Sequence, residues 1–330
     1  MNKTIDVIAI GNAIIDLQVS ATEQEIKDFK LEKGGMKLVS LKEQEQLLSQ
    51  LKSHKINKAS GGSAANTVIA IAALGAKTAY NCMVGDDELG SFYIDELKAL
   101  GVEAATLKNK NFPTATCAVM ITPDAERTMN TFLGASAHLD QEHVSEELIS
   151  KAKWLYVEGY LFSSETGQRV VEKAIGFAKK HNTKIAVTLS DGFIVEFFGV
   201  PLRKALKDAE LVFSNLNEAS KYTGLTEVKE VFAKFAQDFP LAVMTMSEKG
   251  ALIRANSEDH FIPPFPTVAT DDTGAGDMFA GAFLYGINSG LSITESGKLA
   301  CFLASKVVSQ LGPRLKIDLK NIVATKEYLN

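Results

Sequence analysis

Short apolar runs rich in β-branched residues alternate with longer segments of helical periodicity along most of this 330-residue chain. Strand-like runs lie at 5–10, 78–84, 154–158, 184–189, 210–213 and 241–246, and helical segments at 41–53, 63–74, 88–100, 165–181, 226–238, 274–289 and 292–310. Because the strands are almost continuously apolar, both faces of their sheet must be covered, which is typical of parallel sheets. The alternation therefore predicts an α/β fold with three layers, α/β/α, around a mainly parallel sheet.

Signals at the predicted helix ends agree with this interpretation. Ser40 and Glu43 have the spacing of a capping box, in which each side chain bonds the backbone of the other residue. Gly75 and Gly101 follow helical segments at the position where a glycine commonly ends a helix. The helices are thus expected to begin and end at residues suited to those positions.

Two stretches, at about 14–39 and 112–134, break the alternation. The second has the pattern of two alternating strands around a turn at 123–126, which is a hairpin signal. Neither stretch shows a helix to cover it. We therefore expect the two to pair as a small β-sheet lid inserted into a single domain of residues 1–330. An ordinary edge hairpin has the same signature and remains an alternative.

Charge and hydropathy limit the partners of this chain. The net charge is −5 and the isoelectric point is near 5.7, the wrong sign for a polyanion-binding surface. No apolar run approaches the ~18–20 residues of a membrane span. The apolar run 5–10 is interrupted by Asp6, which suits a buried strand better than a signal peptide. We expect no nucleic-acid or membrane partner and a cytoplasmic location.

Several classes of site are disfavoured. Cys82, Cys117 and Cys301 are too few and too far apart for a disulfide framework or a zinc knuckle, and each lies in an apolar stretch that suits a buried thiol. HExxH and paired histidine motifs are absent, as is the G-x-x-x-x-G-K-[ST] sequence of P-loop enzymes. The run from Gly274 has Phe279 where a dinucleotide-binding fingerprint requires its third glycine.

Residues 270–281 carry the strongest functional signal. Gly274, Ala275 and Gly276 precede Asp277 at the start of a helical segment, where the first backbone amides have no partner within the helix. Free amides at the positive end of the helix dipole form an anion site, and small residues let a phosphate approach. Asp277 would then serve as a base that takes a proton from a hydroxyl. Stabilisation of the helix start is the structural alternative.

A second motif runs from Gly61 to Asn66, directly before a helix. Paired glycines, Gly61 and Gly62, permit positive φ and close approach of a ligand, and the Asn66 amide suits a sugar hydroxyl. A tight turn capped by Ser63 is the structural alternative. The motif also nearly matches the nucleophile elbow G-x-S-x-G, with Ser63 as nucleophile and His260 as base of a serine hydrolase. No HGGG-type oxyanion loop accompanies it, which disfavours that class.

Polar residues also follow two of the predicted strands, at the sheet edge where open α/β folds bind ligands. Glu218 could orient a hydrated Mg²⁺ ion, which needs few protein oxygens, whereas Asn215 could simply cap a helix. Thr245, Ser247 and Gly250 end the next strand, and small polar residues there suit contact with a nucleotide.

Asp16 closes a strand-like apolar run at 11–15, where an acidic residue is unusual. Its carboxylate could accept hydrogen bonds from two vicinal hydroxyls at once. An ordinary aspartate at a strand end is the alternative.

Together these motifs resemble the ribokinase-like (PfkB) carbohydrate and nucleoside kinases over essentially the whole chain. Residues 61–66 match the family's Gly-Gly-x-x-x-Asn element, 74–75 and 84–90 follow as in the family, and 271–277 match Asp-x-x-Gly-Ala-Gly-Asp. The order and separation of the two elements are specific. The resemblance implies a three-layer α/β/α domain with a β lid, and ATP-dependent phosphorylation of a primary hydroxyl.

The resemblance also implies roles for single residues. Asp277 would be the general base, and Asn215 and Glu218 would act on Mg²⁺ and phosphate through water. The amides that would hold the transferring phosphoryl group are those of Gly274, Ala275 and Gly276. The acceptor site would contain Asp16, Gly61, Gly62, Ser63, Asn66, Arg127 and Tyr160. The ATP site would contain Asn215, Thr245, Ser247, Gly250, Gly276 and Cys301. Many members also use a monovalent cation such as K⁺ near the anion hole.

Finer features are similar to the adenosine-kinase branch of the family. They are Gly11-Asn12-x-x-x-Asp16, the run 33–39, Arg127-x-Met129-Asn130-Thr131 and Glu158-Gly159-Tyr160. Tyr160 would then line a pocket for a flat base. Two positions depart from the family: Asp272 replaces a usual Ser or Thr beside the anion hole, and Cys301 stands where relatives often have Asn. The second departure concerns the adenine contacts.

We therefore expect an ATP-dependent kinase that phosphorylates the 5′-hydroxyl of a purine nucleoside, with adenosine as the first candidate. A PfkB-type sugar kinase acting on ribose, fructose or a similar compound is the alternative within the fold. A non-catalytic nucleotide-binding regulator is the alternative from another class. The expected partners are small molecules, and the chain would be a monomer or a homodimer.

Overall fold

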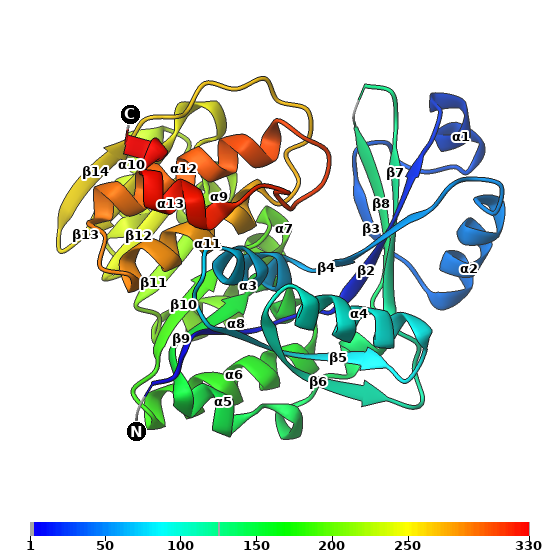
Figure 1. Ribbon diagram of the computed structural model, residues 1–330, viewed down its shortest axis with the longest axis horizontal. Helices are drawn as coiled ribbons and strands as arrows, with labels where there is room; N and C mark the ends of the chain where they lie inside the picture. The colour runs from blue at the N-terminus through cyan, green and yellow to red at the C-terminus, as the bar shows by residue number, and fades with distance from the viewer. Residues whose placement is uncertain (1–2, 125, 330) are drawn as a thin grey trace.

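The computed structural model describes residues 3–124 and 126–329, and its main body is built on a nine-stranded sheet (Figure 1). The strand order is β14-β13-β12-β11-β10-β9-β1-β5-β6. All neighbours pair in parallel except β13, which is antiparallel to β12 and β14. The strands are β1 (Ile5–Ile10), β5 (Thr78–Gly85), β6 (Val102–Asn109), β9 (Ala152–Glu158), β10 (Lys184–Thr188), β11 (Leu211–Asn215), β12 (Leu241–Thr245), β13 (Ala251–Ala255) and β14 (Glu258–Ile262).

Helices cover both faces of this sheet. One face carries α3 (Ser63–Ala73), α4 (Glu88–Ala99), α11 (Ala275–Asn288), α12 (Ile293–Val308) and α13 (Leu319–Thr325). The other carries α5 (Glu146–Lys151), α6 (Glu165–Lys180), α7 (Gly192–Phe197), α8 (Gly199–Leu206), α9 (Leu216–Thr223) and α10 (Val228–Ala236). Short 3₁₀ turns are η1 (Gly134–His138), η2 (Gln141–His143), η3 (Gly159–Ser163), η4 (Ser247–Lys249) and η5 (Glu327–Leu329).

Alternating side chains of the central strand show why both faces need cover. In β1, Val7 and Ala9 belong to the apolar cluster beneath α3 and α11, whereas Ile8 and Ile10 belong to the cluster beneath α5 and α6. All four are almost fully buried. Successive residues of a strand point to opposite faces, so an apolar strand of this kind is stable only between two helical layers. The predicted three-layer α/β/α fold is confirmed.

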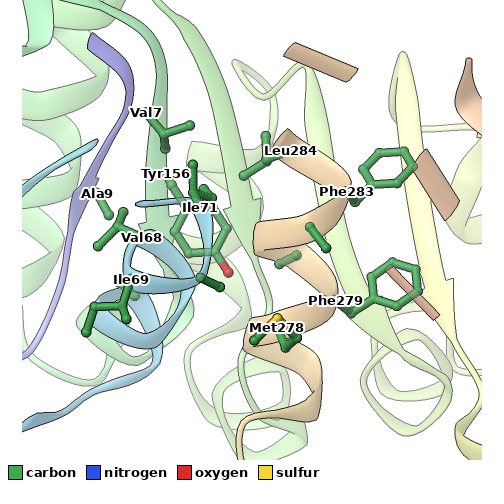
Figure 2. Packing of buried hydrophobic residues seen from close by; sticks show 14 of the residues in the cluster. Val7, Ala9, Val68, Ile69, Ile71, Tyr156, Met278, Phe279, Phe283 and Leu284 are labelled. Atoms are coloured by element: carbon green, nitrogen blue, oxygen red, sulfur yellow. The ribbon is translucent and has the colours of Figure 1, made fainter. Parts of the chain in front are cut away.

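Close packing of α3 against α11 determines the geometry of the candidate site (Figure 2). A Cβ atom built on Gly281 of α11 would lie 2.8 Å from the Thr67 carbonyl oxygen and 3.0 Å from the Ala70 Cβ atom. Glycine therefore allows the two helices to approach this closely. Asp277 lies one helical turn before Gly281 on the same side of α11, which directs it toward α3.

A second, five-stranded sheet, named the lid sheet or lid below, has the strand order β3-β8-β7-β2-β4. Figure 1 shows it to one side of the main body. Its strands are β2 (Ile14–Ser20), β3 (Met36–Leu38), β4 (Asn57–Gly61), β7 (Ala115–Ile121) and β8 (Arg127–Phe132). The antiparallel pairing of β7 with β8 confirms the predicted hairpin, although Ala125 of its turn lies outside the described residues.

The expectation that no helix covers the lid is wrong. Helices α1 (Glu23–Asp28) and α2 (Leu41–Gln50) pack on one face of the lid sheet, around a small cluster that includes Val19, Leu47 and Met120. Helix α1 has only six residues, too few for a periodic pattern, and is recognisable by its capping box between Thr22 and Glu25. Asp16 belongs to the opposite face of the lid sheet, because successive residues of a strand point to opposite faces.

All six predicted strands and all seven predicted helices are present with boundaries shifted by at most three residues. The Ser40–Glu43 capping box is confirmed, and Gly75 and Gly101 have the expected positive φ, 106° and 82°. The three cysteines are buried and free, as predicted. Asp16 does not close a strand, because β2 continues to Ser20. Within residues 3–124 and 126–329, no helix is long and apolar enough to cross a bilayer.

Candidate active site

Asp277 lies in the first turn of α11 and contacts two residues of α3. Its Oδ1 atom accepts a hydrogen bond from Ser63 Oγ at 2.6 Å, and its Oδ2 atom accepts one from Asn66 Nδ2 at 3.1 Å. Burial raises the pKa of the Asp277 carboxyl to about 6, although these two donors and the charge of Arg314 oppose the rise. The carboxylate is therefore ionised at neutral pH and placed to accept a proton from a hydroxyl.

The turn before α11 supplies backbone amides. Gly274 is the N-cap with φ 76°, and the space where a Cβ atom of Gly276 would stand is open. The Ala275 amide donates to the Asp272 carbonyl oxygen at 3.1 Å, which closes the turn. One of the three predicted anion-hole amides is thus already engaged. Across the described ranges, the amides of Gly274 and Gly276 donate to no protein acceptor, so these two can bind an anion.

The Gly61–Asn66 motif brings the lid and α3 together. Gly62 has φ 101°, and a Cβ atom there would overlap the Asn12 carbonyl oxygen. A Cβ atom on Gly61 would stand 2.6 Å from the Asp16 carboxylate. The structural alternative, in which Ser63 caps α3, is wrong. Gly62 is the N-cap, and the Ser63 hydroxyl donates to the Asp277 carboxylate.

The serine hydrolase alternative is wrong. His260 lies in β14 with its Nδ1 atom 3.4 Å from Thr294 Oγ1, and it has no contact with Ser63. The Ser63 hydroxyl donates to the Asp277 carboxylate, which leaves it without the histidine base that such a nucleophile requires.

Asp16 projects from β2 on the face of the lid sheet opposite α1 and α2. Burial raises the pKa of its carboxyl to about 6, opposed by the charges of Arg127 and Arg314 and increased further by Asp277. Two carboxylates, one on strand β2 and the other on helix α11, therefore lie within electrostatic range of each other. The Asp16 carboxylate has no protein donor among the hydrogen bonds of the described residues, so its oxygens can accept from a ligand.

Arg127, at the start of β8, pairs with a residue of the main body. Its Nη1 atom lies 3.3 Å from Asp271 Oδ2, and both side chains are buried. Asp271 also accepts hydrogen bonds from the Thr273 amide at 3.0 Å and the Gly312 amide at 2.8 Å. The first aspartate of the 271–277 motif thus connects the lid, the turn before α11 and the loop after α12. The predicted contact of Arg127 with substrate stays a prediction.

Glu158, at the end of β9, holds the backbone at Asn12 and at the start of α3. Its carboxylate accepts from the Asn12 amide and side chain, both at 2.7 Å, and from the Ala64 amide at 2.9 Å. A Cβ atom on Gly11 would stand 2.6 Å from this carboxylate. Burial raises the pKa of Glu158 to about 7. The sequence indicated Glu158 only as part of a run next to Tyr160, and this positioning role was missed.

Asn215 and Glu218 form a capping box at the start of α9, so the structural alternative for Asn215 is confirmed. The buried Glu218 carboxylate accepts from the Asn215 amide at 3.0 Å and from its side chain at 2.7 Å. Burial and the nearby Asp191 raise the pKa of Glu218 to about 7. Among the described residues, no three His, Cys, Asp or Glu side chains gather as a metal cluster. A single carboxylate in a region of excess negative charge fits a Mg²⁺ ion held through its own water molecules.

The predicted ATP-site residues after β12 form a tight turn. Thr245 ends the strand, and Ser247 is exposed with φ 50°. Gly250 has φ 84°, and a Cβ atom there would overlap the Ile262 carbonyl oxygen, so this turn requires glycine. Thr245 is in register with Asn215 in the pairing of β11 with β12, so the turn begins beside Asn215.

The structure also shows the surroundings of Cys301, Tyr160 and Asp272. Cys301 is buried in α12, where burial raises the pKa of its thiol to about 12. Tyr160 follows β9 in a 3₁₀ turn, and burial with the nearby charges of Asp191, Asp277 and Glu218 raises its pKa. Asp272 is exposed in the turn before α11.

Arg314 is a residue that the sequence did not single out. Its guanidinium donates to the Ser60 carbonyl oxygen and lies 3.3 Å from Asn66 Oδ1, between the lid and α3. It is a lone arginine in an irregular loop, and no local pattern marks it.

A carboxylate at a helix N-terminus, free amides beside it and a second carboxylate on the smaller sheet fit a phosphotransferase that acts on a hydroxyl group. Comparison with known proteins identifies the family: residues 6–319 match the pfkB family carbohydrate kinases, and the chain belongs to that family.

The similar proteins include two kinds of kinase. An adenosine kinase of Schizophyllum commune is 27% identical, with 93% of this chain and 96% of that protein covered. A 5-dehydro-2-deoxygluconokinase of Clostridium tetani is 24% identical, with 98% and 94% covered.

Two solved structures share the fold closely. A probable sugar kinase from Rhizobium etli is 34% identical with a TM-score of 0.92, covering 99% of this chain and all of that one. An adenosine kinase from Sinorhizobium meliloti is 32% identical with a TM-score of 0.90, covering 98% and 99%. The ribokinase-like fold and the kinase class are therefore established, whereas the acceptor is open between nucleosides and sugars.

Proposed function

We propose that this chain is an ATP-dependent kinase that phosphorylates the 5′-hydroxyl of a purine nucleoside, with adenosine as the leading acceptor. The observation that carries the proposal is the position of Asp277, held by Ser63 and Asn66 beside two amides that have no protein acceptor. The adenosine kinases among its relatives support the nucleoside as acceptor.

In this proposal Asp277 takes the proton from the attacking hydroxyl. The amides of Gly274 and Gly276 hold the phosphoryl group that is transferred, together with the N-terminal end of the α11 dipole. Glu218 and Asn215 would orient the water shell of Mg²⁺, which balances phosphate charge when bound. A monovalent cation such as K⁺ is part of the proposal only through the family resemblance.

Asp16 would fix the acceptor from the lid by accepting hydrogen bonds from two vicinal ribose hydroxyls. Because Gly61 has no side chain, the acceptor can lie close to the backbone beside Asp16. Closure of the lid over the acceptor would exclude water, which otherwise competes for the phosphoryl group. Tyr160 is proposed to line the base pocket.

The test is ADP release with ATP, Mg²⁺ and a panel of nucleosides and sugars, for the unaltered chain and for Asp277→Asn. We expect Asp277→Asn to lower kcat by at least ~10²-fold while nucleoside binding is retained, since the fold keeps its other contacts. Asp208→Asn, at a surface ion pair with Lys179, is the matched control and should keep full activity.

The outcomes separate the candidate functions. Turnover with nucleosides that is lost in Asp277→Asn supports the proposal, and unchanged turnover in that variant contradicts it. A response only to free sugars or sugar acids would replace the nucleoside with the sugar-kinase alternative, which the Clostridium tetani relative favours. Nucleotide binding without any turnover would indicate a regulator.

A further inference from the structure

The loop of residues 309–318, between α12 and α13, reaches across to the acceptor site. Figure 1 shows this segment in red on the side of the main body that faces the lid. The Gly312 amide donates to Asp271 Oδ2 at 2.8 Å, and Pro313 packs so closely on Gly274 that a Cβ atom there would overlap it. The loop is thus in contact with the turn that carries the anion-binding amides.

Arg314 extends from this loop to β4 and α3. Its Nη2 atom donates to the Ser60 carbonyl oxygen and lies 3.3 Å from Asn66 Oδ1. Its Nη1 atom lies 3.7 Å from Glu96 Oε2, which also accepts from the Ser60 amide at 2.5 Å. The side chain is mostly buried, and its Nε atom has no protein partner among the described residues. Its carboxylate partner, Glu96, lies 3.7 Å away, so this mostly buried guanidinium keeps a positive field in its surroundings.

Asn66 connects Arg314 with Asp277 through hydrogen bonds. Asn66 Oδ1 faces Arg314, and Asn66 Nδ2 donates to Asp277 Oδ2 at 3.1 Å. An amide has its acceptor and its donor on opposite sides, so a cation on the oxygen side fixes the N–H side toward the carboxylate. Arg314, Asn66 and Asp277 therefore form one connected series of hydrogen bonds.

From this geometry we propose that Arg314 is a positioning residue for phosphoryl transfer. It orients the Asn66 amide toward Asp277, and its positive charge favours the ionised form of that base. This inference rests on the proposed function and goes beyond it, because it assigns part of the catalytic geometry to a loop outside both family motifs.

Other charged and titratable groups also face Asp277 or the Asp16–Asp277 pair. Lid residues Asp16 and Arg127, β9 residues Tyr156 and Glu158, and Tyr160 of η3 contribute to the same field. The carboxylates among them oppose ionisation of Asp277, and Arg127 pairs directly with Asp271. Arg314 is thus the cation linked to Asp277 through a hydrogen-bonding side chain.

The test is the pH profile of kcat for Arg314→Gln and Arg314→Lys. Loss of a cation near a buried carboxylate destabilises the ionised base, so we expect the acid limb of Arg314→Gln to move upward by about one pH unit. At neutral pH kcat should fall by about tenfold, since orientation is lost as well. Arg314→Lys keeps the charge, so its acid limb should stay in place while kcat falls.

Arg254→Gln is the matched control, because Arg254 pairs with Asp259 on the adjacent strand, away from the candidate site. If the acid limb of the kcat profile is not shifted in Arg314→Gln while the unaltered chain is fully active, the inference is overturned and the proposed function is left intact. A shift of equal size in Arg314→Lys or Arg254→Gln would also overturn it. Arg314→Met, which retains the apolar stem, provides the same measurement if Arg314→Gln does not fold.

Absence of kinase activity in the unaltered chain is a different result, because it contradicts the proposed function itself. The two failures are therefore distinguishable in one set of assays.

Discussion

Replacing Gly281 by alanine would test whether close packing of α3 on α11 holds the catalytic geometry. In a helix interior, Gly→Ala alone stabilises by about 1 kcal/mol. Here the new Cβ atom would stand 2.8 Å from the Thr67 carbonyl oxygen, a backbone atom that cannot rotate away. Overpacking of this kind costs about 1–3 kcal/mol. The net effect of Gly281→Ala is thus a loss of up to about 2 kcal/mol in the free energy of unfolding.

The same substitution should affect turnover. Ordinary van der Waals contact begins at 3.4 Å, so the two helices must separate locally by about 0.6 Å. One turn away, the Asn66–Asp277 hydrogen bond is already 3.1 Å long and would be weakened or broken. Misplacement of about 1 Å can cost ~10²-fold in rate, so roughly a tenfold loss of kcat is expected here.

Gly176→Ala is the matched control, because Gly176 lies inside α6 with no heavy atom within 4 Å of a built Cβ. That variant should gain about 0.5–1 kcal/mol and keep full activity. Urea unfolding and steady-state ADP release measure both quantities. The reasoning would be refuted if Gly281→Ala were stabilised as much as Gly176→Ala and turned over at the same rate.

Two further predictions concern the carboxylates of the site. Asp16→Ala should raise the KM for the acceptor by tenfold or more with a smaller change in kcat, because ~1.5–3 kcal/mol of charge-assisted hydrogen bonding is lost. An unaltered KM in initial-rate kinetics would show that Asp16 is not part of the site. Burial raises the pKa of Asp277 to about 6, and only the ionised form is a base, so kcat should be constant above about pH 7 and fall tenfold per pH unit well below pH 6. A profile that is flat down to pH 4.5 would contradict that role.

Six of the nine strands of the main sheet could be predicted from the sequence because they are apolar and bounded by helices with clear periodicity. Strands β6, β13 and β14, at the two ends of the sheet, were missed. Strand β4 was missed since Asn57–Gly61 has almost no residue that favours strands. It forms through pairing with β2, which is a tertiary contact. Helix α1 was missed because six residues span too few turns to show a period. Pairing and covering of the lid thus depend on contacts that a local pattern does not contain.

The candidate site also contains some residues whose roles a local sequence pattern indicates and others that depend on tertiary contacts. Asp277 and Gly276 lie in one local motif, so their roles could be inferred from a helix start and small residues. The hydrogen bond from the Ala275 amide to the Asp272 carbonyl oxygen could not be inferred, because it depends on the folded conformation of the turn. Arg314 is brought to Asn66 only by the folded loop, and nothing adjacent in sequence indicates it.

The residues that surround Asp277 are brought together from remote parts of the chain. The Asn66–Asp277 contact joins positions 211 residues apart, and the Arg314–Ser60 contact joins positions 254 apart. Closing such long loops is slow compared with forming a local helix. In refolding, helical structure should therefore form early. The active conformation should form later, when the segment of Ser60 and Asn66 contacts the segment of Asp277 and Arg314. A nascent chain that stops before residue 314 would lack Arg314 and α13, so its proposed acceptor site would remain incomplete.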